Sequence, residues 1–408
     1  MLTIGAICRA CESDKLSVFL NLGSVPIVNN FALTNSSSKR FPLKLLICKS
    51  CWMAQTEDIL SKKQIFNYDY PYFSSQSASF VEHAKIYSKY IINKLNLSGD
   101  AFVVEVASND GYLLKNFIDN SIPCLGIEPT ESTAIAAKKN NIPTINKFFD
   151  KKLAVQLVEE YGKADLIVAN NVLAHVPNIN DFIYGLSYLL NSNGTITIEF
   201  PDLQNFMSGV LFDSAYHEHF SYLSLTSLIP VLNRHGLAIY EVEKISTHGG
   251  GYRIFLSKTG EKEITQSVEK VLFSEIDSGL NSIEIYQEFQ SKVDTIAVKF
   301  KFMVGKLCDQ GHKVSGYGAA AKAVILLNYC NMQSGYIENV FDSTPAKIGK
   351  LLPGTSLQVT DESLIPKFHE NIFIVFPWNH YSEMRKKLLS YGVPAQNIID
   401  WRHYDFLQ

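Results

Sequence analysis

The sequence predicts an α/β protein of three parts, and three observations support this fold class. Short apolar runs alternate with helical periodicity over residues 73–260, and the same alternation returns over residues 311–408. Residues 261–310 carry helical periodicity alone and are expected to be connecting helices. Residues 1–72 are rich in turn residues and hold four of the seven cysteines. A chain of 408 residues is longer than one hydrophobic core usually supports, so several domains are expected.

Two cysteine pairs in the first part predict a zinc-binding module. Cys8 and Cys11 form one C-x-x-C pair, and Cys48 and Cys51 form another. Each pair presents two thiolates, and four thiolates match a closed tetrahedral site for one structural Zn²⁺ ion. The alternative is four ordinary buried cysteines. We expect the ion to hold together a module too small to build its own core.

Four apolar runs in the central part predict the parallel strands of an α/β sheet. They are rich in Val, Ile and Leu and close in turn residues, which is typical of strands buried on both faces. The runs are FVVEVASNDG (102–111), CLGIEP (124–129), ADLIVANNVL (164–173) and GTITIEFPDL (194–203).

The first of these strands runs into a polar turn that suggests a ligand. Glu105 lies near the strand end, and the turn that follows contains Ser108, Asn109, Asp110 and Gly111. A dinucleotide-binding turn would carry three glycines, so a pyrophosphate cradle is not expected here. An acid before a polar turn suits a ligand with a charged amino-acid tail. Glu128 closes the next strand, where a carboxylate can accept hydrogen bonds from both hydroxyls of a ribose. Taken singly, each acid could equally be a solvated strand end.

The segment SAYHEHFSYLSL (214–225) gathers titratable side chains and predicts proton transfer. His219 suits general-base chemistry near neutral pH, and a neighbouring carboxylate such as Glu218 would stabilise its protonated form. In an extended segment Tyr216 and Glu218 would face one side, and His217 and His219 the other. A turn is therefore needed if Glu218 and His219 share a pocket. A metal site is the weaker alternative, because HEH lacks the i, i+4 spacing of H-E-x-x-H, and a polar strand edge is the remaining one.

The second α/β pattern begins with SGYGAAAKA (315–323), a glycine turn after a strand. Its backbone N–H groups and Lys322 could lie near phosphates. Tight packing of the following helix on the sheet explains the glycines equally well.

Over nearly its full length the chain resembles the sugar C-methyltransferases. Besides the cysteine pairs, the motifs that carry the resemblance occur in the family's order: LGSVPIVNNFAL, YPYFSSQS, ASNDG, YHEHFSYLS, HGG, GYGAAAKA, DSTPAKIGKLLPGT and FPWNH. The resemblance implies a class I, Rossmann-like methyltransferase domain between the zinc-binding module and a C-terminal Rossmann-like substrate-binding domain. It implies S-adenosylmethionine as the cofactor and methylation of carbon 3 of a nucleotide-linked 4-keto-6-deoxy hexose. The chain departs from the family in GYGAAAKAV, where GYGAPAKGN is common, and in the GYR that follows HGG. The identity of the sugar and of the nucleotide therefore stays open.

The resemblance also implies roles for individual residues. His219 would be the base that forms an enolate, with Glu218 or Tyr216 orienting it. Tyr70 or Tyr72 would approach from the first part. Besides Glu105, the 108–111 turn and Glu128, the residues expected to contact the cofactor are Asn170, Asn171, His175 and a phenylalanine, Phe148 or Phe149. The residues expected to contact the nucleotide-diphosphate keto sugar are His217, Tyr222, His248, Arg253, Tyr317, Lys322, Trp378, Asn379 and His380.

Several other functions are less compatible with the sequence. An O- or N-methyltransferase acting on a related nucleotide sugar is the nearest alternative, and it would not need a base able to form an enolate. A net charge of −3 and the lack of a basic run disfavour a nucleic-acid-modifying or scaffold protein. No apolar run reaches the roughly 18 residues of a membrane span. The odd number of cysteines and an N-terminus unlike a secretory signal predict a cytoplasmic protein, which we expect to be a monomer or a weak homo-oligomer.

Overall fold

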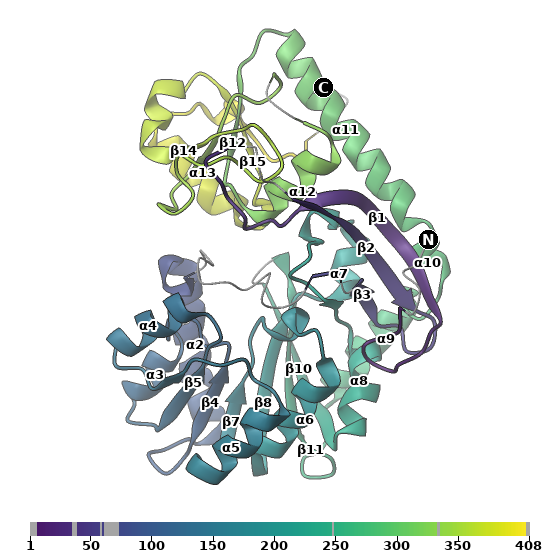
Figure 1. The fold of residues 1–408 in the computed structure, drawn as a ribbon, viewed down its shortest axis with the longest axis vertical. Coiled ribbons are helices and arrows are strands. Elements are labelled where there is room, and N and C mark those ends of the chain that lie inside the picture. Colours follow the sequence, from purple (N-terminus) through teal and green to yellow (C-terminus); the bar gives the residue numbers. More distant parts are fainter. Residues whose placement is uncertain are drawn as a thin grey trace.

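The computed structural model describes residues 6–34, 39–57, 59–60, 73–246, 249–332 and 335–404. Within these residues the strands form three sheets, one for each part of the chain (Figure 1). No helix in the described ranges combines the length and the apolar composition needed to cross a bilayer. The predicted α/β class is confirmed.

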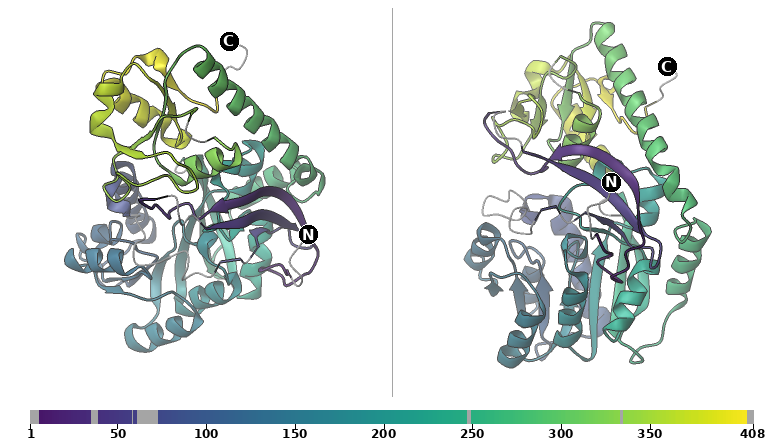
Figure 2. Two further views of the ribbon diagram at one scale, coloured as in Figure 1. Left: turned by 45° about the horizontal axis from the view of Figure 1, so that its top comes forward. Right: turned by 45° about the vertical axis from the view of Figure 1, so that its right-hand side comes forward.

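The first sheet is antiparallel and has the strand order β1-β2-β3-β9. Its strands are β1 (Leu16–Pro26), β2 (Arg40–Cys48), β3 (Ala54–Thr56) and β9 (Ser221–Tyr222). Strand β9 directly follows the YHEHF segment, so its pairing with β3 brings that segment to the N-terminal part of the chain. Figures 1 and 2 show β1 and β2 as a long curved ribbon beside helix α11 (Phe289–Asp309). The ring of Phe19 in β1 packs edge-to-face against the ring of Phe289 in α11.

The central sheet has the order β10-β11-β8-β7-β4-β5-β6. Its strands are β4 (Val103–Val106), β5 (Cys124–Ile127), β6 (Thr144–Ile145), β7 (Ala164–Val168), β8 (Leu190–Phe200), β10 (Leu237–Ile245) and β11 (Gly251–Lys258). Strands β4 to β8 are mutually parallel, and β11 lies antiparallel between β8 and β10. This order with one reversed strand is that of class I methyltransferases, as predicted. The four apolar runs are β4, β5, β7 and β8.

Helices cover both faces of the central sheet, because its strands are apolar on both sides. They are α2 (Ala78–Leu95), α3 (Leu114–Ile118), α4 (Glu131–Lys139), α5 (Lys151–Tyr161), α6 (Ile179–Leu189) and α8 (Leu225–Arg234). Helix α7 (Leu203–Ser208) instead buries its apolar residues in a core formed by the first and last parts of the chain. Alternate residues of β4 point to different cores: Val103 packs with α2 and α3, whereas Val104 packs with α5, α6 and α8. Asp150 and Asn178 accept backbone hydrogen bonds at the starts of α5 and α6.

The C-terminal sheet is parallel, with the order β14-β13-β12-β15-β16. Its strands are β12 (Val314–Tyr317), β13 (Val340–Asp342), β14 (Val359–Asp361), β15 (Ile372–Val375) and β16 (Ile398–Ile399). The helical periodicity of residues 261–310 corresponds to α9 (Gln266–Asp277), α10 (Glu284–Gln287) and α11, and the C-terminal part adds α12 (Ala321–Tyr329) and α13 (Tyr381–Ser390).

One hydrophobic core joins the first and last parts of the chain. It includes Leu45 of β2, Phe300 of α11, Val324 of α12 and Ile374 of β15, all fully buried. The N-terminal strands therefore share their core with the C-terminal sheet rather than building one alone. The domain boundaries at residues 72, 260 and 310 stay a prediction.

Candidate functional site

The polar turn after β4 lies where the order of the central sheet reverses. Strand β4 pairs with β5 on one side and with β7 on the other, and crevices at such switch points bind ligands. The turn is tight, with positive φ at Ala107, Asn109 and Gly111. At Gly111 a side chain is excluded, because a Cβ atom there would meet Ile142 Cγ1 at 2.6 Å. The backbone thus passes very close to its neighbour at this edge.

Glu105 lies beneath this turn and is almost completely buried, with 2% of its surface exposed. Burial, together with the negative charges of Glu128 and Asp110, raises the pKa of Glu105 well above its ordinary value. Its Oε2 atom has no hydrogen-bond partner among the described residues. A buried carboxylate cluster that lacks a cation is costly, so the crevice suits a positively charged ligand.

Four further buried polar atoms around the same crevice have no hydrogen-bond partner within the described ranges. They are Ser108 Oγ, Asp110 Oδ1, Asn170 Oδ1 and Asn171 Oδ1. Buried polar groups are normally paired, so these atoms indicate a polar ligand. S-adenosylmethionine, with its ammonium group, sulfonium centre and ribose hydroxyls, fits this set.

Glu128 follows β5 and is also buried, which raises the pKa of its carboxyl group. Its Oε2 accepts a hydrogen bond from the backbone N–H of Asn109 at 2.9 Å, and its Oε1 accepts one from that of Thr130 at 2.8 Å. A carboxylate offers about four acceptor positions, so the two oxygens can still accept from two ribose hydroxyls. Glu128 therefore supports the turn and can still accept the hydrogen bonds predicted from the ribose hydroxyls.

Residues 73–76 of the YPYFSSQS motif pack against the turn formed by residues 108–111. The backbone N–H of Ser74 donates to Asn109 Oδ1 at 2.9 Å, and that of Ser75 donates to Asp110 Oδ2 at 3.2 Å. Tyr70 and Tyr72 lie outside the described residues, and their approach to the site stays a prediction.

His175, which follows β7 in the chain, contacts the YHEHF segment, and its predicted contact with the cofactor stays a prediction. Its Nδ1–H donates to the carbonyl of Glu218 at 2.9 Å, and burial lowers its pKa to about 4. Of the two candidate phenylalanines, Phe149 packs edge-to-face against Phe182 of α6. Contact of Phe148 or Phe149 with adenine stays a prediction.

The YHEHF segment forms a turn rather than an extended strand. The backbone N–H of His219 donates to the carbonyl of Tyr216 at 3.0 Å. The ring of His219 lies 4.1 Å from that of Tyr216 and 4.7 Å from that of His175, between centroids. Tyr222 lies 5.9 Å away. The turn therefore packs three aromatic rings around His219.

The two neighbours of His219 in sequence, Glu218 and His217, contact the N-terminal part of the chain. Glu218 Oε1 accepts a hydrogen bond from Asn29 Nδ2 at 2.7 Å. The Nε2–H of His217 donates to the carbonyl of Pro42 at 3.1 Å, and burial lowers the pKa of His217. Asn29 was not singled out from the sequence, although it lies within the LGSVPIVNNFAL motif.

The four cysteines of the first part come together as predicted. All four Sγ atoms lie within 4.8 Å of one another, and the Cys8–Cys51 and Cys11–Cys48 pairs are 3.5 and 3.6 Å apart. Tetrahedral zinc with Zn–S bonds of about 2.3 Å places sulfurs roughly 3.8 Å apart, so the cluster fits Zn²⁺. The two cysteine loops are alike: Glu12 and Trp52, each with a positive φ, donate their N–H groups to the carbonyls of Cys8 and Cys48.

The FPWNH strand end of the C-terminal sheet faces the central domain. Trp378 Nε1–H donates to Asp213 Oδ2 at 2.7 Å, and Asp213 is fully buried. Lys322 Nζ and the Arg402 guanidinium carbon each lie 5.3 Å from a ring centroid of Trp378. A Cβ on Gly249 would meet Trp378 at 2.6 Å, so the HGG motif also reaches this point. Asp213 and Arg402 were missed because neither belongs to a recognisable local motif.

The remaining substrate candidates differ in their surroundings. Asn379 and His380 line, with Trp378, a cavity of about 360 Å³. Arg253 is buried, and its guanidinium forms ion pairs with Glu199 and Glu243. The Tyr317 hydroxyl donates to Glu362 at 2.8 Å, and the Tyr222 hydroxyl accepts from the Tyr216 N–H at 3.3 Å. His248 lies outside the described residues. The pairings of Arg253 and Tyr317 explain their burial without a ligand, and their role in substrate binding stays a prediction.

Comparison with known proteins gives three family matches in chain order. They are "Putative zinc binding domain" over residues 8–66, "Methyltransferase domain" over residues 87–242 and "C-methyltransferase C-terminal domain" over residues 246–396. The chain is also similar to the C-methyltransferase NovU of Streptomyces niveus. The identity is 27% over 381 residues, which cover 92% of this chain and 90% of that protein.

Solved structures give weaker likenesses. The magnesium protoporphyrin IX methyltransferase of Synechocystis PCC 6803 with bound SAM matches with a TM-score of 0.37 and 15% identity, over 50% of this chain and 100% of that chain. The PH0226 protein of Pyrococcus horikoshii OT3 matches with a TM-score of 0.39 and 13% identity, over 46% of this chain and 95% of that chain. TM-scores this low describe a partial likeness, so the fold assignment rests on the strand order and the family matches.

Proposed function

From these matches and the motifs, we propose that the chain is a sugar C-methyltransferase and that it catalyses a specific reaction. The coarse activity is S-adenosylmethionine-dependent C-methyl transfer. The proposed substrate is a nucleotide-activated 4-keto-6-deoxy sugar, methylated at carbon 3 through an enolate. The observation that carries the proposal is the His219 ring packed against the rings of Tyr216 and His175, the second of which follows β7 of the central sheet.

Methylation of a carbon next to a ketone requires a base. The proton on carbon 3 is acidic only because its loss spreads negative charge onto the keto oxygen. In the proposed reaction His219 accepts that proton at a ring nitrogen, and an O–H donor stabilises the oxygen charge. Tyr216 and Tyr222 are the phenols beside His219, and burial raises the pKa of Tyr222, so its phenol stays protonated.

The site also holds the other reactant in place. When bound, S-adenosylmethionine supplies a methyl group on a positively charged sulfur. Glu105 and the 108–111 turn are proposed to bind its methionine end, and Glu128 its ribose. Because these residues lie at the ends of β4 and β5, they can fix the position of the donor, and most of the remaining catalysis would be orientation of the two reactants.

The substrate is proposed to lie between the central and C-terminal sheets. Lys322, Trp378, Asn379 and His380 would hold its nucleotide diphosphate, and Arg402 adds a second cation beside Trp378. All seven cysteines lie in the described ranges and none forms a disulfide, which fits the proposed cytoplasmic location. We propose a monomer or a weak homo-oligomer.

Proton exchange tests the proposal directly. A panel of nucleotide-linked keto sugars is incubated with the protein in heavy water without methyl donor, and deuterium at carbon 3 is measured by NMR. With donor present, mass spectrometry measures methyl transfer. We expect His219→Ala to lose about 10²–10⁴ in both rates while it still binds donor and sugar nucleotide, because the base acts in the transition state.

His217→Ala is the matched control, since His217 donates to Pro42 rather than lying against Tyr216. Its effect should be much milder. Normal exchange in His219→Ala together with loss in His217→Ala would mean that the base is misassigned. Methyl transfer without any carbon 3 exchange, and to an oxygen or nitrogen, would favour an O- or N-methyltransferase instead.

A further inference from the structure

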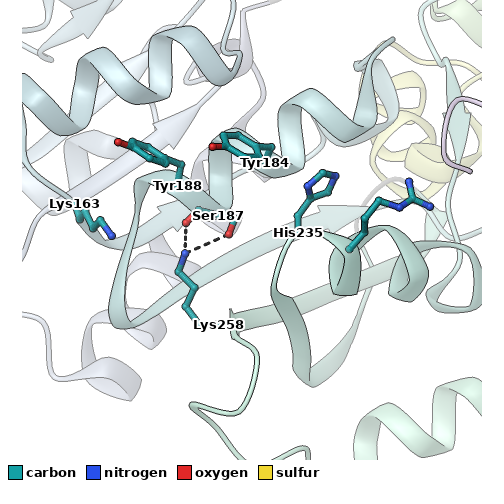
Figure 3. Close-up of a pocket in the computed structure, with 7 residues that line it drawn as sticks. Lys163, Tyr184, Ser187, Tyr188, His235 and Lys258 are labelled. Carbon is teal, nitrogen blue, oxygen red and sulfur yellow. Dashed lines mark hydrogen bonds between the residues drawn. The ribbon is translucent and has the colours of Figure 1, made fainter.

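A second cavity lies at the opposite edge of the central sheet from the candidate active site. Its volume is about 380 Å³ (Figure 3). Lys163 immediately precedes β7, Ser187 lies near the end of α6, and Lys258 ends the reversed strand β11. All three positions belong to the edge where β7 and β8 begin, whereas the cofactor crevice lies where the parallel strands end.

The lining of this cavity is strongly basic. Lys163, Lys258 and Arg234 contribute three cations and His235 a further titratable ring, and no carboxylate is among the described residues that line it. Burial and the neighbouring charge of Lys163 lower the pKa of Lys258, and the carboxylate of Glu261 nearby only partly opposes this. Lys163 and Lys258 repel each other, and an anion between them would relieve that repulsion.

The basic groups are held in position by the surrounding elements. Lys258 Nζ donates to the carbonyl oxygen and the hydroxyl of Ser187, and in Figure 3 Lys163 and Lys258 approach Ser187 from two sides. Arg234 Nη1 donates to Asn180 Oδ1 at 2.8 Å and to the carbonyl of Ala10 at 2.6 Å, and His235 Nε2 lies 3.1 Å from the same Asn180 oxygen. Because a guanidinium has five N–H donors, Arg234 keeps donors for a ligand.

Aromatic rings form the remaining wall. Tyr184 and Tyr188 lie nearly parallel, with centroids 6.3 Å apart, and His235 meets Tyr184 edge-to-face at 6.2 Å. Lys151 lies 4.1 Å over the Tyr184 ring and adds a cation beside the rim. Basic groups at fixed positions next to aromatic rings suit a phosphate carried by a small organic molecule.

We propose that this cavity binds a phosphate group of a small molecule, at a site separate from the one that methylates the sugar. Its volume lies within the range of about 300–1,000 Å³ typical of small-molecule sites, so it has room for more than the phosphate itself. The phosphate oxygens would accept hydrogen bonds from Lys163, Lys258 and Arg234. This site does not depend on the identity of the sugar substrate.

Titration calorimetry on the full-length, zinc-loaded protein tests the proposal, with inorganic phosphate as the first probe. We expect Lys163→Gln with Lys258→Gln to weaken phosphate binding about tenfold or more. Lys301→Gln, which changes an exposed lysine of α11, is the matched control and should leave the affinity unchanged. Lys163→Gln alone should weaken binding in the same direction, and its side chain is exposed, so folding should be preserved.

Two further probes identify the source of the phosphate. A hexose 1-phosphate and a nucleoside 5′-diphosphate are titrated into wild type and into the double variant. Binding that is lost in the double variant is assigned to this cavity, and binding that remains is assigned to other sites. Tighter binding of either compound than of inorganic phosphate would support a ligand larger than phosphate. The proposal is overturned if phosphate binds equally well to the folded double variant, or if no probe binds the wild type in a manner that depends on Lys163 or Lys258.

Discussion

Replacement of Glu128 by alanine should weaken donor binding through the loss of one carboxylate. That carboxylate accepts hydrogen bonds from the N–H groups of Asn109 and Thr130, at 2.9 and 2.8 Å, and is proposed to accept two more from the ribose. The variant therefore probes the turn and the ligand together. The experiment must separate these two contributions.

The magnitude follows from the bonds that disappear. A hydrogen bond to a charged group contributes about 1.5–3 kcal/mol, so loss of the two N–H partners could cost about 3–6 kcal/mol. Removal of Glu128 also relieves its repulsion of Glu105, which offsets part of this loss. We expect the free energy of unfolding to fall by about 2 kcal/mol net. Each of the two ribose hydrogen bonds that is lost should weaken donor binding about ten- to hundredfold.

Calorimetry with S-adenosylhomocysteine and with its 2′-deoxy analogue separates the two effects. Wild type should prefer the complete ribose by about tenfold or more, whereas Glu128→Ala should lose that preference, because the acceptor of the hydroxyl is gone. Glu131→Ala, at the exposed start of α4, is the control and should behave as wild type.

Two outcomes would refute this reasoning. Unchanged affinity in folded Glu128→Ala would mean that the donor binds elsewhere. Weaker binding of both ligands with the ribose preference intact would show that Glu128 only supports the turn.

Three other predictions concern the carboxylate cluster, the zinc site and the pH dependence of stability. Glu105→Gln should stabilise the ligand-free protein at pH 7 by about 1 kcal/mol, because it removes a buried charge, yet it should weaken donor binding. Thermal unfolding measures the stability and calorimetry measures the binding. A less stable variant would contradict the argument. Metal analysis of wild type should find about one zinc per chain, which Cys8→Ser should lose together with more than about 2 kcal/mol of stability. Folded, purified wild type without zinc would contradict the site. Stability should fall as the pH drops from about 6.5 to about 4, since buried His175 has its pKa lowered to about 4 and the unfolded chain binds the proton first. His175→Gln should flatten that slope in urea titrations, and an unchanged slope would show that other groups cause it.

The parts of this protein that could be predicted from the sequence are those set by local spacing. The apolar runs that became β4, β5, β7 and β8 depend on residue type and strand period alone. The C-x-x-C spacing by itself places two thiolates on one loop. The structure adds how the two pairs come together, because β1 and β2 pair with Leu16 opposite Cys48 and thereby bring the two loops side by side.

The directions of the YHEHF side chains depended on tertiary structure. Extended geometry would place His217 and His219 on one face, but a turn closed by the His219 N–H and the Tyr216 carbonyl separates their partners. From the sequence we inferred that a turn is needed if Glu218 and His219 share a pocket, but not which residues form it. Pairing of β9 with β3 then sets which residues of the N-terminal part lie opposite, including Asn29 against Glu218.

Only the tertiary structure revealed the contacts between residues far apart in the chain. Asp213, Trp378 and Arg402 meet where the central and C-terminal sheets approach each other. Lys163 and Lys258 come close enough to repel each other because β8 pairs with β7 on one side and with the reversed strand β11 on the other. Periodicity records which face of an element is apolar, but it does not record which element packs against that face. These contacts therefore depend on the packing of whole elements, which no local pattern encodes.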